Sequence, residues 1–223
     1  MKCLFVTGTD VEVGKTTSSS LLLQIANNYG YRTAGYKPIA SGCKITSEGI
    51  RNNDALILQR YSSVSLNYSQ INPLSFIEPT APHILSAKEN TPILFSTLSN
   101  GLLKLKKLAN WIIIEGSGGW YTPISSSQLY ADWVHLEQLA VILVVGVKLG
   151  CINHAILTVE SIKFRGLNLA GWIANTIIPP DKYYEDYIIS LKKMLPQPCL
   201  GVIPYLGLCE HSKSYNDFLI LPE

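Results

Sequence analysis

The feature that most constrains this chain is a glycine-rich stretch near its start, GTDVEVGKTT at residues 8–17. A short apolar run precedes it and a segment with helical apolar spacing follows it, which is the context that a phosphate-binding loop requires. Backbone N–H groups in such a loop, at the start of a helix, bind anions. We expect Lys15 to reach the terminal phosphates of a nucleotide and Thr16 to offer its hydroxyl to Mg²⁺.

The spacing of this loop departs from the common pattern, because five residues separate Gly8 from Gly14 instead of the usual four. An ordinary turn, with Gly14 as a hinge and Lys15 in solvent, is the alternative interpretation. The order of glycine, lysine and hydroxyl favours phosphate binding. The additional residue then implies a different loop path, one that projects Glu12 toward a substrate.

The rest of the chain predicts an α/β fold of the P-loop NTPase type, with a mostly parallel sheet flanked by helices on both faces. Helical apolar spacing separates short apolar runs at residues 3–6, 33–36, 111–114, 140–145, 170–174 and 200–203. We expect one domain over residues 1–223, in which the proline-containing residues 62–92 form a long irregular region along one side. Ligands of such sheets bind beyond the carboxyl ends of the strands.

Composition narrows the class of protein further. A net charge of +2 gives no electrostatic case for nucleic acid, and no apolar run is long enough to cross a membrane. The apolar run at the start of the chain is too short for a signal peptide, and the scattered cysteines form no metal-binding or disulfide pattern. The histidines are not spaced as metal ligands. These properties predict a cytoplasmic protein.

Three polar residues follow predicted strands or begin a helix near the same edge of the sheet. Glu115 ends the run WIIIE, where a carboxylate is best explained as a metal ligand. Asp54 lies in RNNDALILQ, where Asn53 or Asp54 could simply cap a helix. Lys37 ends another run and could be solvated, but a second ammonium beside a phosphate loop favours an additional anionic substrate.

Together these segments closely resemble the dethiobiotin synthetase family over nearly the whole chain. The resemblance lies in GTDVEVGKT, AGYKPIASG, the Asn-Asp pair of RNNDALILQR, EPTAPH, IIEGSGGWYTP, ADWV and VILVVGVKLGCINHA. The family has the same longer phosphate loop. It implies an enzyme, a ligase that uses ATP and Mg²⁺ to convert 7,8-diaminononanoate and CO₂ into dethiobiotin, through a carbamate and its mixed anhydride with phosphate.

The resemblance also implies roles for individual residues. Lys37 and Lys15 are the catalytic residues, and Thr16, Asp54 and Glu115 hold Mg²⁺, which replaces the capping interpretation of Asp54. The residues implied to contact ATP are Glu12, Val13, Gly14, Lys15, Thr16, Thr17, Asp54, Glu115, Gly116, Ser117, Gly118, Asn175, Thr176, Pro204, Tyr205, Leu206 and His211.

The family is a homodimer with its substrate at the subunit interface, so a partner subunit is implied here too. Ser41 is then expected beside the diamine, and Gly150, Cys151, Asn153 and Tyr187 near its carboxylate. Residues 150–153 open a predicted helix, whose N–H groups can bind a carboxylate. Cys151 can at the same time fill a buried space, and Tyr187 can equally belong to the core.

The chain departs from the family pattern at three positions. Val11 stands where the family's loop often has a hydroxyl residue, Thr176 where an aspartate often follows Asn175, and His211 where a glutamate is expected. The alternative functions are a switch ATPase of the ParA and MinD kind or another ligase of the same superfamily. The switch ATPases need a second lysine early in the loop, and Thr9, Asp10 and Val11 supply none.

Overall fold

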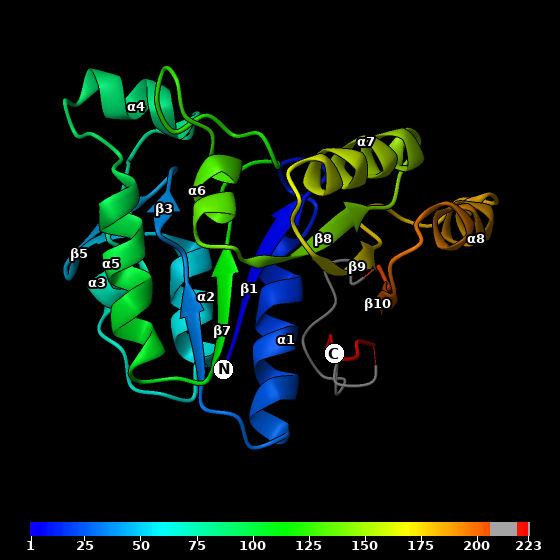
Figure 1. Cartoon of the computed structure of the whole chain (residues 1–223), viewed down its shortest axis with the longest axis horizontal. Coiled ribbons are helices and arrows are strands. Elements are labelled where there is room, and N and C mark those ends of the chain that lie inside the picture. Colours follow the sequence, from blue (N-terminus) through cyan, green and yellow to red (C-terminus); the bar gives the residue numbers. More distant parts are fainter. Residues whose placement is uncertain (206–217, 223) are drawn as a thin grey trace.

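Six parallel strands form the central sheet in the order β10-β9-β8-β1-β7-β2 (Figure 1). The computed structural model describes residues 1–205 and 218–222. The sheet strands are β1 (Lys2–Gly8), β2 (Thr33–Tyr36), β7 (Trp111–Glu115), β8 (Ala140–Gly146), β9 (Leu169–Asn175) and β10 (Cys199–Ile203). Each of the six predicted apolar runs is therefore a strand of one sheet, and the predicted α/β class is confirmed.

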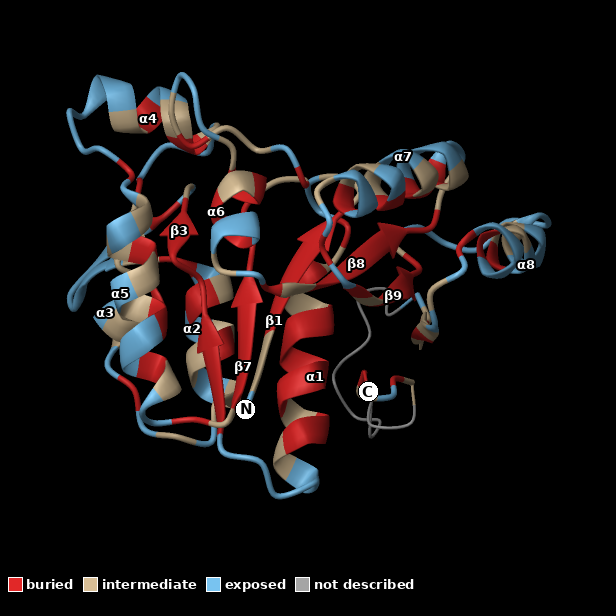
Figure 2. Ribbon diagram, in the orientation of Figure 1, coloured by how far each residue is buried: buried red, intermediate tan, exposed pale blue. Residues whose placement is uncertain are grey.

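The sheet is buried because helices cover both of its faces. Figure 2 shows buried strands between helices that expose their outer sides. The longer helices are α1 (Lys15–Asn28), α2 (Asn53–Tyr61), α5 (Phe95–Lys106), α7 (Cys151–Phe164) and α8 (Tyr184–Met194). Helix α1 takes the chain from β1 toward β2, whereas α7 takes it from β8 to β9 in the opposite direction. Right-handed crossovers then place these two helices on opposite faces of the sheet.

The region predicted to be irregular over residues 62–92 contains regular structure, which corrects that prediction. It includes α3 (Tyr68–Ile71), β6 (Leu74–Ser75) and α4 (Pro82–Lys88). Prolines mark turns in a sequence, but Pro82 stands at the first helical position, where its fixed φ angle suits the helix. Strand β6 pairs with β3 (Ile39–Ala40) directly after β2, so this region packs beside the ends of the sheet strands.

The remaining elements are short. Strands β4 (Lys44–Thr46) and β5 (Gly49–Arg51) form an exposed antiparallel hairpin, and α6 (Tyr130–Leu136) lies between β7 and β8. In the described part of the chain, no helix is both long and apolar enough to span a membrane.

The strand order places the predicted site residues together. Strands β1, β7 and β2 are neighbours, and they end at the phosphate loop, at Glu115 and next to Lys37. The helix α2 packs on β2 and brings Asp54 to the same edge. The carboxyl edge of the sheet is therefore the framework of the candidate site.

Gly35 tests this framework, because α2 packs closely over it. A Cβ atom at this position would lie 2.6 Å from the Leu58 Cβ and 3.2 Å from the Leu58 carbonyl oxygen. We expect Gly35→Ala to displace α2 and lower the free energy of unfolding by about 1–3 kcal/mol, the usual cost of overpacking. Chemical denaturation measures this change.

Gly119→Ala is the matched control, since its Cβ would come no closer than 3.6 Å to a neighbouring atom, the Gly8 carbonyl oxygen. Equal stabilities of the two variants would show that α2 does not depend on the close approach to Gly35.

Candidate active site

The phosphate loop accommodates its additional residue by turning two neighbouring side chains in opposite directions. Val13 is fully buried, and its carbonyl oxygen accepts a hydrogen bond from Asn175 Nδ2 at 2.9 Å. Glu12 is exposed, with a left-handed φ of 55°, which is uncommon for a residue other than glycine. The structure thus directs Glu12 outward into the cleft above the loop, as the spacing predicts.

Gly14 is the residue on which this loop path depends. It precedes α1 with a φ of 86°, and a Cβ there would collide with the Asn175 side-chain amide. Because Gly14 has no side chain, none caps the first N–H groups of α1, and these groups face the cleft as anion donors. Lys15 Nζ donates to the Asp10 carbonyl oxygen at 2.8 Å, and burial, aided by nearby Lys37, lowers the Lys15 pKa to about 8.

Lys37, the buried Glu115 and the partly exposed Asp54 form a cluster next to this loop. Lys37 Nζ lies 2.5 Å from Glu115 Oε1, 3.0 Å from Asp54 Oδ2 and 3.3 Å from the Gly116 carbonyl oxygen. Burial by itself would lower the pKa of Lys37, but the Glu115 and Asp54 carboxylates outweigh it and raise the pKa. Burial would likewise raise the pKa of Asp54, and the Lys37 ammonium holds it below its usual value.

Asp54 is free to join the cluster because another residue caps α2. The side-chain oxygen of Asn52 accepts the Ala55 backbone N–H at 3.2 Å, so neither Asn53 nor Asp54 performs the capping that the sequence left open. A sequence motif shows that a cap is needed, but three adjacent polar residues do not show which of them provides it.

Thr16 completes a group of oxygen ligands suitable for a divalent cation. Its hydroxyl donates to Glu115 Oε1 at 2.9 Å, and Glu115 itself is fully buried. Glu115 Oε2 has no hydrogen-bond partner among the described residues. Two carboxylates and a hydroxyl beside a phosphate loop match the ligand preference of Mg²⁺, which also keeps phosphate oxygens and water. The residues present therefore fit this metal.

These groups line a cleft of about 870 Å³, large enough for a nucleotide and a second small molecule. The predicted residues that line it are Glu12, Gly14, Lys15, Thr16, Thr17, Lys37, Ser41, Asp54, Glu115, Ser117 and Gly118. Val13 and Gly116 are buried behind its wall. The cleft is also lined by residues 79–82 and by Thr122 and Pro123, to which sequence reasoning gave no role.

Four of the residues predicted near the nucleotide base, Asn175, Thr176, Pro204 and Tyr205, lie at the end of β9 or beyond β10, outside the lining of this cleft. Asn175 and Thr176 are buried, and Thr176 Oγ1 shares a 2.7 Å hydrogen bond with the Tyr184 hydroxyl. Asn175 has a contact that the sequence did not indicate, because its amide supports the phosphate loop. Pro204 is partly buried and Tyr205 exposed, whereas Leu206 and His211 lie outside the described residues.

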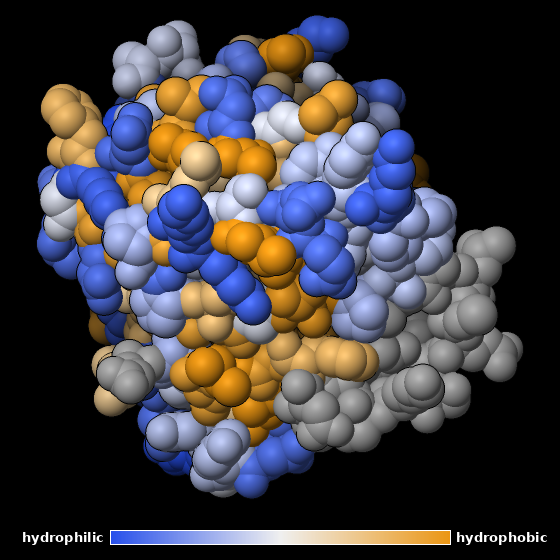
Figure 3. Space-filling view, turned by 90° about the vertical axis from the view of Figure 1, so that its right-hand side faces the viewer, coloured by the Kyte–Doolittle hydropathy of each residue, from blue (hydrophilic) through white to orange (hydrophobic). Residues whose placement is uncertain are grey.

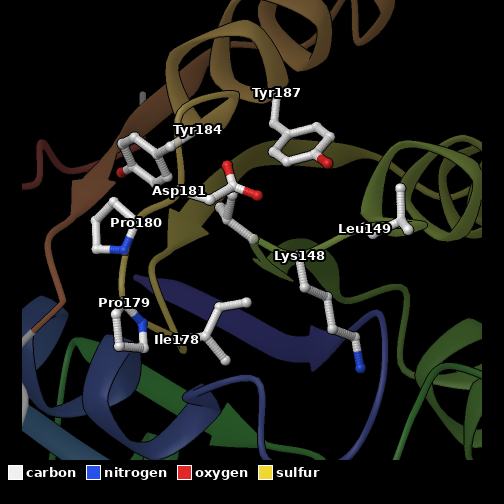
Figure 4. Close-up of a pocket in the computed structure, with 9 residues that line it drawn as sticks. Lys148, Leu149, Ile178, Pro179, Pro180, Asp181, Tyr184 and Tyr187 are labelled. Atoms are coloured by element: carbon white, nitrogen blue, oxygen red, sulfur yellow. The ribbon is translucent and has the colours of Figure 1, made fainter.

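A second group of predicted residues gathers where α7 begins. Gly150 precedes α7 with a φ of 91° and, like Gly14, offers no side-chain cap. The Cys151 side chain is buried, so it fills space as one interpretation proposed, and Asn153 is exposed. Tyr187 is partly buried and lines a pocket of about 20 Å³ with Lys148, Leu149 and Asp181 (Figure 4).

Lys148 also connects this second group with the phosphate loop. Its Nζ lies 3.7 Å from Asp10 Oδ2, and its carbonyl oxygen accepts the Cys151 backbone N–H at 3.0 Å. Sequence reasoning missed Lys148 and Asp10. The run VKLGCINH draws attention to this lysine, but only the adjacency of β1 and β8 brings it to the loop.

Comparison with known proteins decides the family. The family model described as an AAA domain matches residues 2–213. The ATP-dependent dethiobiotin synthetase BioD 1 of Escherichia coli is 58% identical over 206 residues, which cover 92% of each chain. That of Salmonella typhimurium is 53% identical over 220 residues, 99% of this chain and 96% of the relative.

The chain belongs to the dethiobiotin synthetase family. This is a family of ATP-dependent ligases, so the predicted resemblance and enzyme class are confirmed. Among solved structures, the cell division protein MinD of Aquifex aeolicus gives a TM-score of 0.56 over 92% of this chain and 82% of that one. At 14% identity, the likeness of this dethiobiotin synthetase family member to MinD concerns the P-loop fold alone.

The two helix-capping glycines provide a test of the loop geometry. Gly14 and Gly150 share a left-handed conformation, but a Cβ at Gly14 would meet Asn175, whereas one at Gly150 would meet nothing within 4 Å. Both alanine variants should lose roughly 1–2 kcal/mol of unfolding free energy to the backbone conformation. Gly14→Ala should lose more, because it also disrupts the Asn175 contact.

Chemical denaturation of both variants measures the difference. Adding Asn175→Ala should reduce the additional cost of Gly14→Ala, since it removes the atoms that clash. A cost for Gly14→Ala no larger than that for Gly150→Ala would contradict the close packing of Asn175 on the loop.

Proposed function

We propose that this protein is an ATP- and Mg²⁺-dependent dethiobiotin synthetase of biotin biosynthesis, which joins 7,8-diaminononanoate and CO₂ into the cyclic urea of dethiobiotin and releases ADP and phosphate. The family assignment supports the reaction class. The observation that carries the proposal is the pair of buried lysines, Lys15 and Lys37, at one cleft with Glu115 and Asp54. A nucleotide site alone needs the first lysine, whereas the second suits a further anionic reactant.

The chemistry begins with an amine of the diamine that attacks CO₂ and loses a proton to give a carbamate. A carbamate oxygen then attacks the γ-phosphorus of ATP and ADP leaves, which forms a carbamic-phosphoric mixed anhydride. The second amine attacks the anhydride carbonyl carbon and loses a proton, the C–O bond to phosphate breaks, and the ring closes as phosphate departs. Each step collects negative charge at the cleft, so the enzyme has to supply fixed positive charge.

In this proposal Lys15 binds the terminal phosphates and Lys37 binds the carbamate and the transferring phosphoryl group. An ammonium 4 Å from a unit negative charge contributes about 4 kcal/mol at an effective dielectric of 20. That exceeds the roughly 0.3–1 kcal/mol typical of a helix dipole, so the lysines dominate over the α1 terminus. Glu12 and Ser41 lie at the same cleft, where they can orient the amine and the carbamate.

Thr16, Asp54 and Glu115 would hold Mg²⁺, which neutralises phosphate charge when it is bound. Asn175, Thr176, Pro204, Tyr205, Leu206 and His211 are proposed to surround the base. Asn175 has only part of its amide available to the base, because its Nδ2 already donates a hydrogen bond to the Val13 carbonyl oxygen. The base site is therefore coupled to the loop path in this chain.

The proposal includes a homodimer in the cytoplasm, with the diamine carboxylate bound by Gly150, Cys151, Asn153 and Tyr187 of the neighbouring subunit. Two features support it. The pocket beside Tyr187 is about 20 Å³, room for roughly one or two water molecules, so a second surface has to complete it. Figure 3, which faces the end of the molecule near α8, shows apolar patches, and Leu157, Phe164 and Ile189 of α7 and α8 are exposed.

A MinD-like switch ATPase is the main rival, and the cleft disfavours it. The early loop residues Thr9, Asp10 and Val11 carry no lysine, and the second ammonium comes instead from Lys37 beyond β2. A related ligase with another acceptor would share the phosphate site, so the acceptor has to be tested directly.

Incubation with ATP, Mg²⁺, bicarbonate and 7,8-diaminononanoate should yield dethiobiotin, detected by mass spectrometry. Lys37→Gln should retain ATP binding and lose at least about a hundredfold in kcat, since one buried transition-state charge contributes several kcal/mol. No product from the wild-type enzyme, together with brisk ATP hydrolysis without the diamine, would refute the proposal. Normal turnover in Lys37→Gln would remove Lys37 from the mechanism.

Tyr187→Phe tests the carboxylate site. A hydrogen bond to a charged group contributes about 1.5–3 kcal/mol, so the diamine KM should rise by roughly ten- to a hundredfold with little change in kcat. Tyr183→Phe is the control, because Tyr183 precedes α8 and is half exposed. An unchanged KM for Tyr187→Phe would assign Tyr187 to packing.

A further inference from the structure

The Lys37 ammonium lies among the oxygen atoms that are proposed to bind the metal. It contacts Glu115 Oε1 at 2.5 Å and Asp54 Oδ2 at 3.0 Å. Glu115 Oε1 also accepts the Thr16 hydroxyl at 2.9 Å. Two of the three proposed metal ligands, Glu115 and Asp54, thus contact Lys37 directly, and Thr16 is bound to the same Glu115 oxygen.

An ammonium and Mg²⁺ cannot share these oxygens in the same arrangement. Mg²⁺ requires ligand oxygens at about 2.0–2.1 Å in near-octahedral geometry, with lone pairs directed at the metal. Lys37 and Thr16 already use the lone pairs of Glu115 Oε1, and of this carboxylate only Oε2 has no partner among the described residues. Two cations at one carboxylate would also repel each other strongly at a buried site. A metal bound through Glu115 Oε1 and Asp54 Oδ2 therefore requires Lys37 to leave both carboxylates.

The position of Lys37 limits where its ammonium can go. Lys37 directly follows β2 and is buried. It also lines the cleft that contains Lys15 and Ser41. Released from the carboxylates, the flexible side chain can extend into this cleft, where the acceptor substrate would lie.

We propose that Lys37 occupies the metal site of the nucleotide-free enzyme, and that binding of the metal with ATP transfers its ammonium from Asp54 and Glu115 to the reacting end of the acceptor substrate. This inference rests on the proposed function for the identity of the metal ligands. Lys37 then couples two events, because it becomes available to the anionic acceptor only after the metal has been loaded.

The charge balance explains why the metal should arrive with the nucleotide. With Lys37 in place, the charge of Asp54 and Glu115 is half neutralised and one oxygen of each carboxylate is engaged, so a free divalent cation competes poorly. ATP adds phosphate oxygens as further ligands for the metal and gives the displaced ammonium a new anionic partner. Both contributions favour exchange only in the presence of the nucleotide.

Mn²⁺ binding, followed by the loss of the free-ion electron paramagnetic resonance signal, tests the exchange in the whole enzyme. Without nucleotide, Lys37→Gln should bind Mn²⁺ at least about tenfold more tightly than wild type, because a competing cation in contact with both carboxylates is gone. With a saturating non-hydrolysable ATP analogue, wild type should bind Mn²⁺ tightly. Equal affinities of the two nucleotide-free proteins would overturn the inference.

Lys15→Gln is the matched control, since it removes a charge from the same cleft but Lys15 Nζ bonds to the Asp10 carbonyl oxygen. Its nucleotide-free Mn²⁺ affinity should change by less than about threefold, as expected for a charge not in contact with the ligands. If Lys15→Gln increased the Mn²⁺ affinity as much as Lys37→Gln does, the increase would be a general effect of removing positive charge, and direct competition by Lys37 would be refuted. Wild-type enzyme that binds no Mn²⁺ even with the analogue would instead refute the proposed metal site.

A measurement on the wild-type protein covers the case in which Lys37→Gln does not fold. With ADP bound, addition of Mg²⁺ should raise the rate at which acetic anhydride acetylates Lys37, scored by peptide mass spectrometry, because the released amine is no longer held by two carboxylates. Lys163, at the far end of α7, serves as an internal reference in the same digest. An unchanged or slower reaction of Lys37 would contradict the exchange.

Discussion

The buried contact between Lys37 and Glu115 is the interaction around which the site is organised. Both side chains lie almost wholly out of solvent, and Asp54 adds a second carboxylate to the ammonium. Desolvation of such charges costs several kcal/mol per ion, so a buried ion pair is poor evidence of a stability advantage over apolar side chains. Removing one partner would nevertheless be costly, because the other charge stays buried. Chemistry at the cleft gives a better reason for this cluster than stability does.

The order of the strands in the sheet brings the residues of this cluster together. Strands β1, β7 and β2 are adjacent, so three segments far apart in the sequence end within one side-chain length of each other. The Lys37 ammonium comes from the residue that follows β2, the strand at the edge of the sheet, and α2 supplies Asp54. A parallel sheet buried on both faces fixes these strand ends rigidly, which preorganised electrostatics requires.

Sequence reasoning could locate the strands and the phosphate loop because both depend on local patterns, namely continuous apolar runs and the order of glycine, lysine and hydroxyl. It also placed Lys37 and Glu115 at one edge, since parallel strands share a direction. It failed mainly where contacts between residues far apart in the sequence determine the structure. The pairing of Asn175 with Val13 and that of β6 with β3 depend on neighbours that no local window contains. The Asn52 cap is a local contact, but two further polar residues follow Asn52 directly and the sequence pattern does not choose among them.

The additional loop residue shows how closely local and distant constraints are connected here. Five residues between Gly8 and Gly14 let Val13 turn inward and Glu12 outward, and the inward turn places the Val13 carbonyl oxygen against Asn175 at the end of β9. The same amide leaves no room for a side chain at Gly14. A larger residue at 14 could not keep the Asn175 side chain in place. Gly14 and Asn175 therefore have to change together, which links the phosphate end of the site to the strand proposed to receive the base.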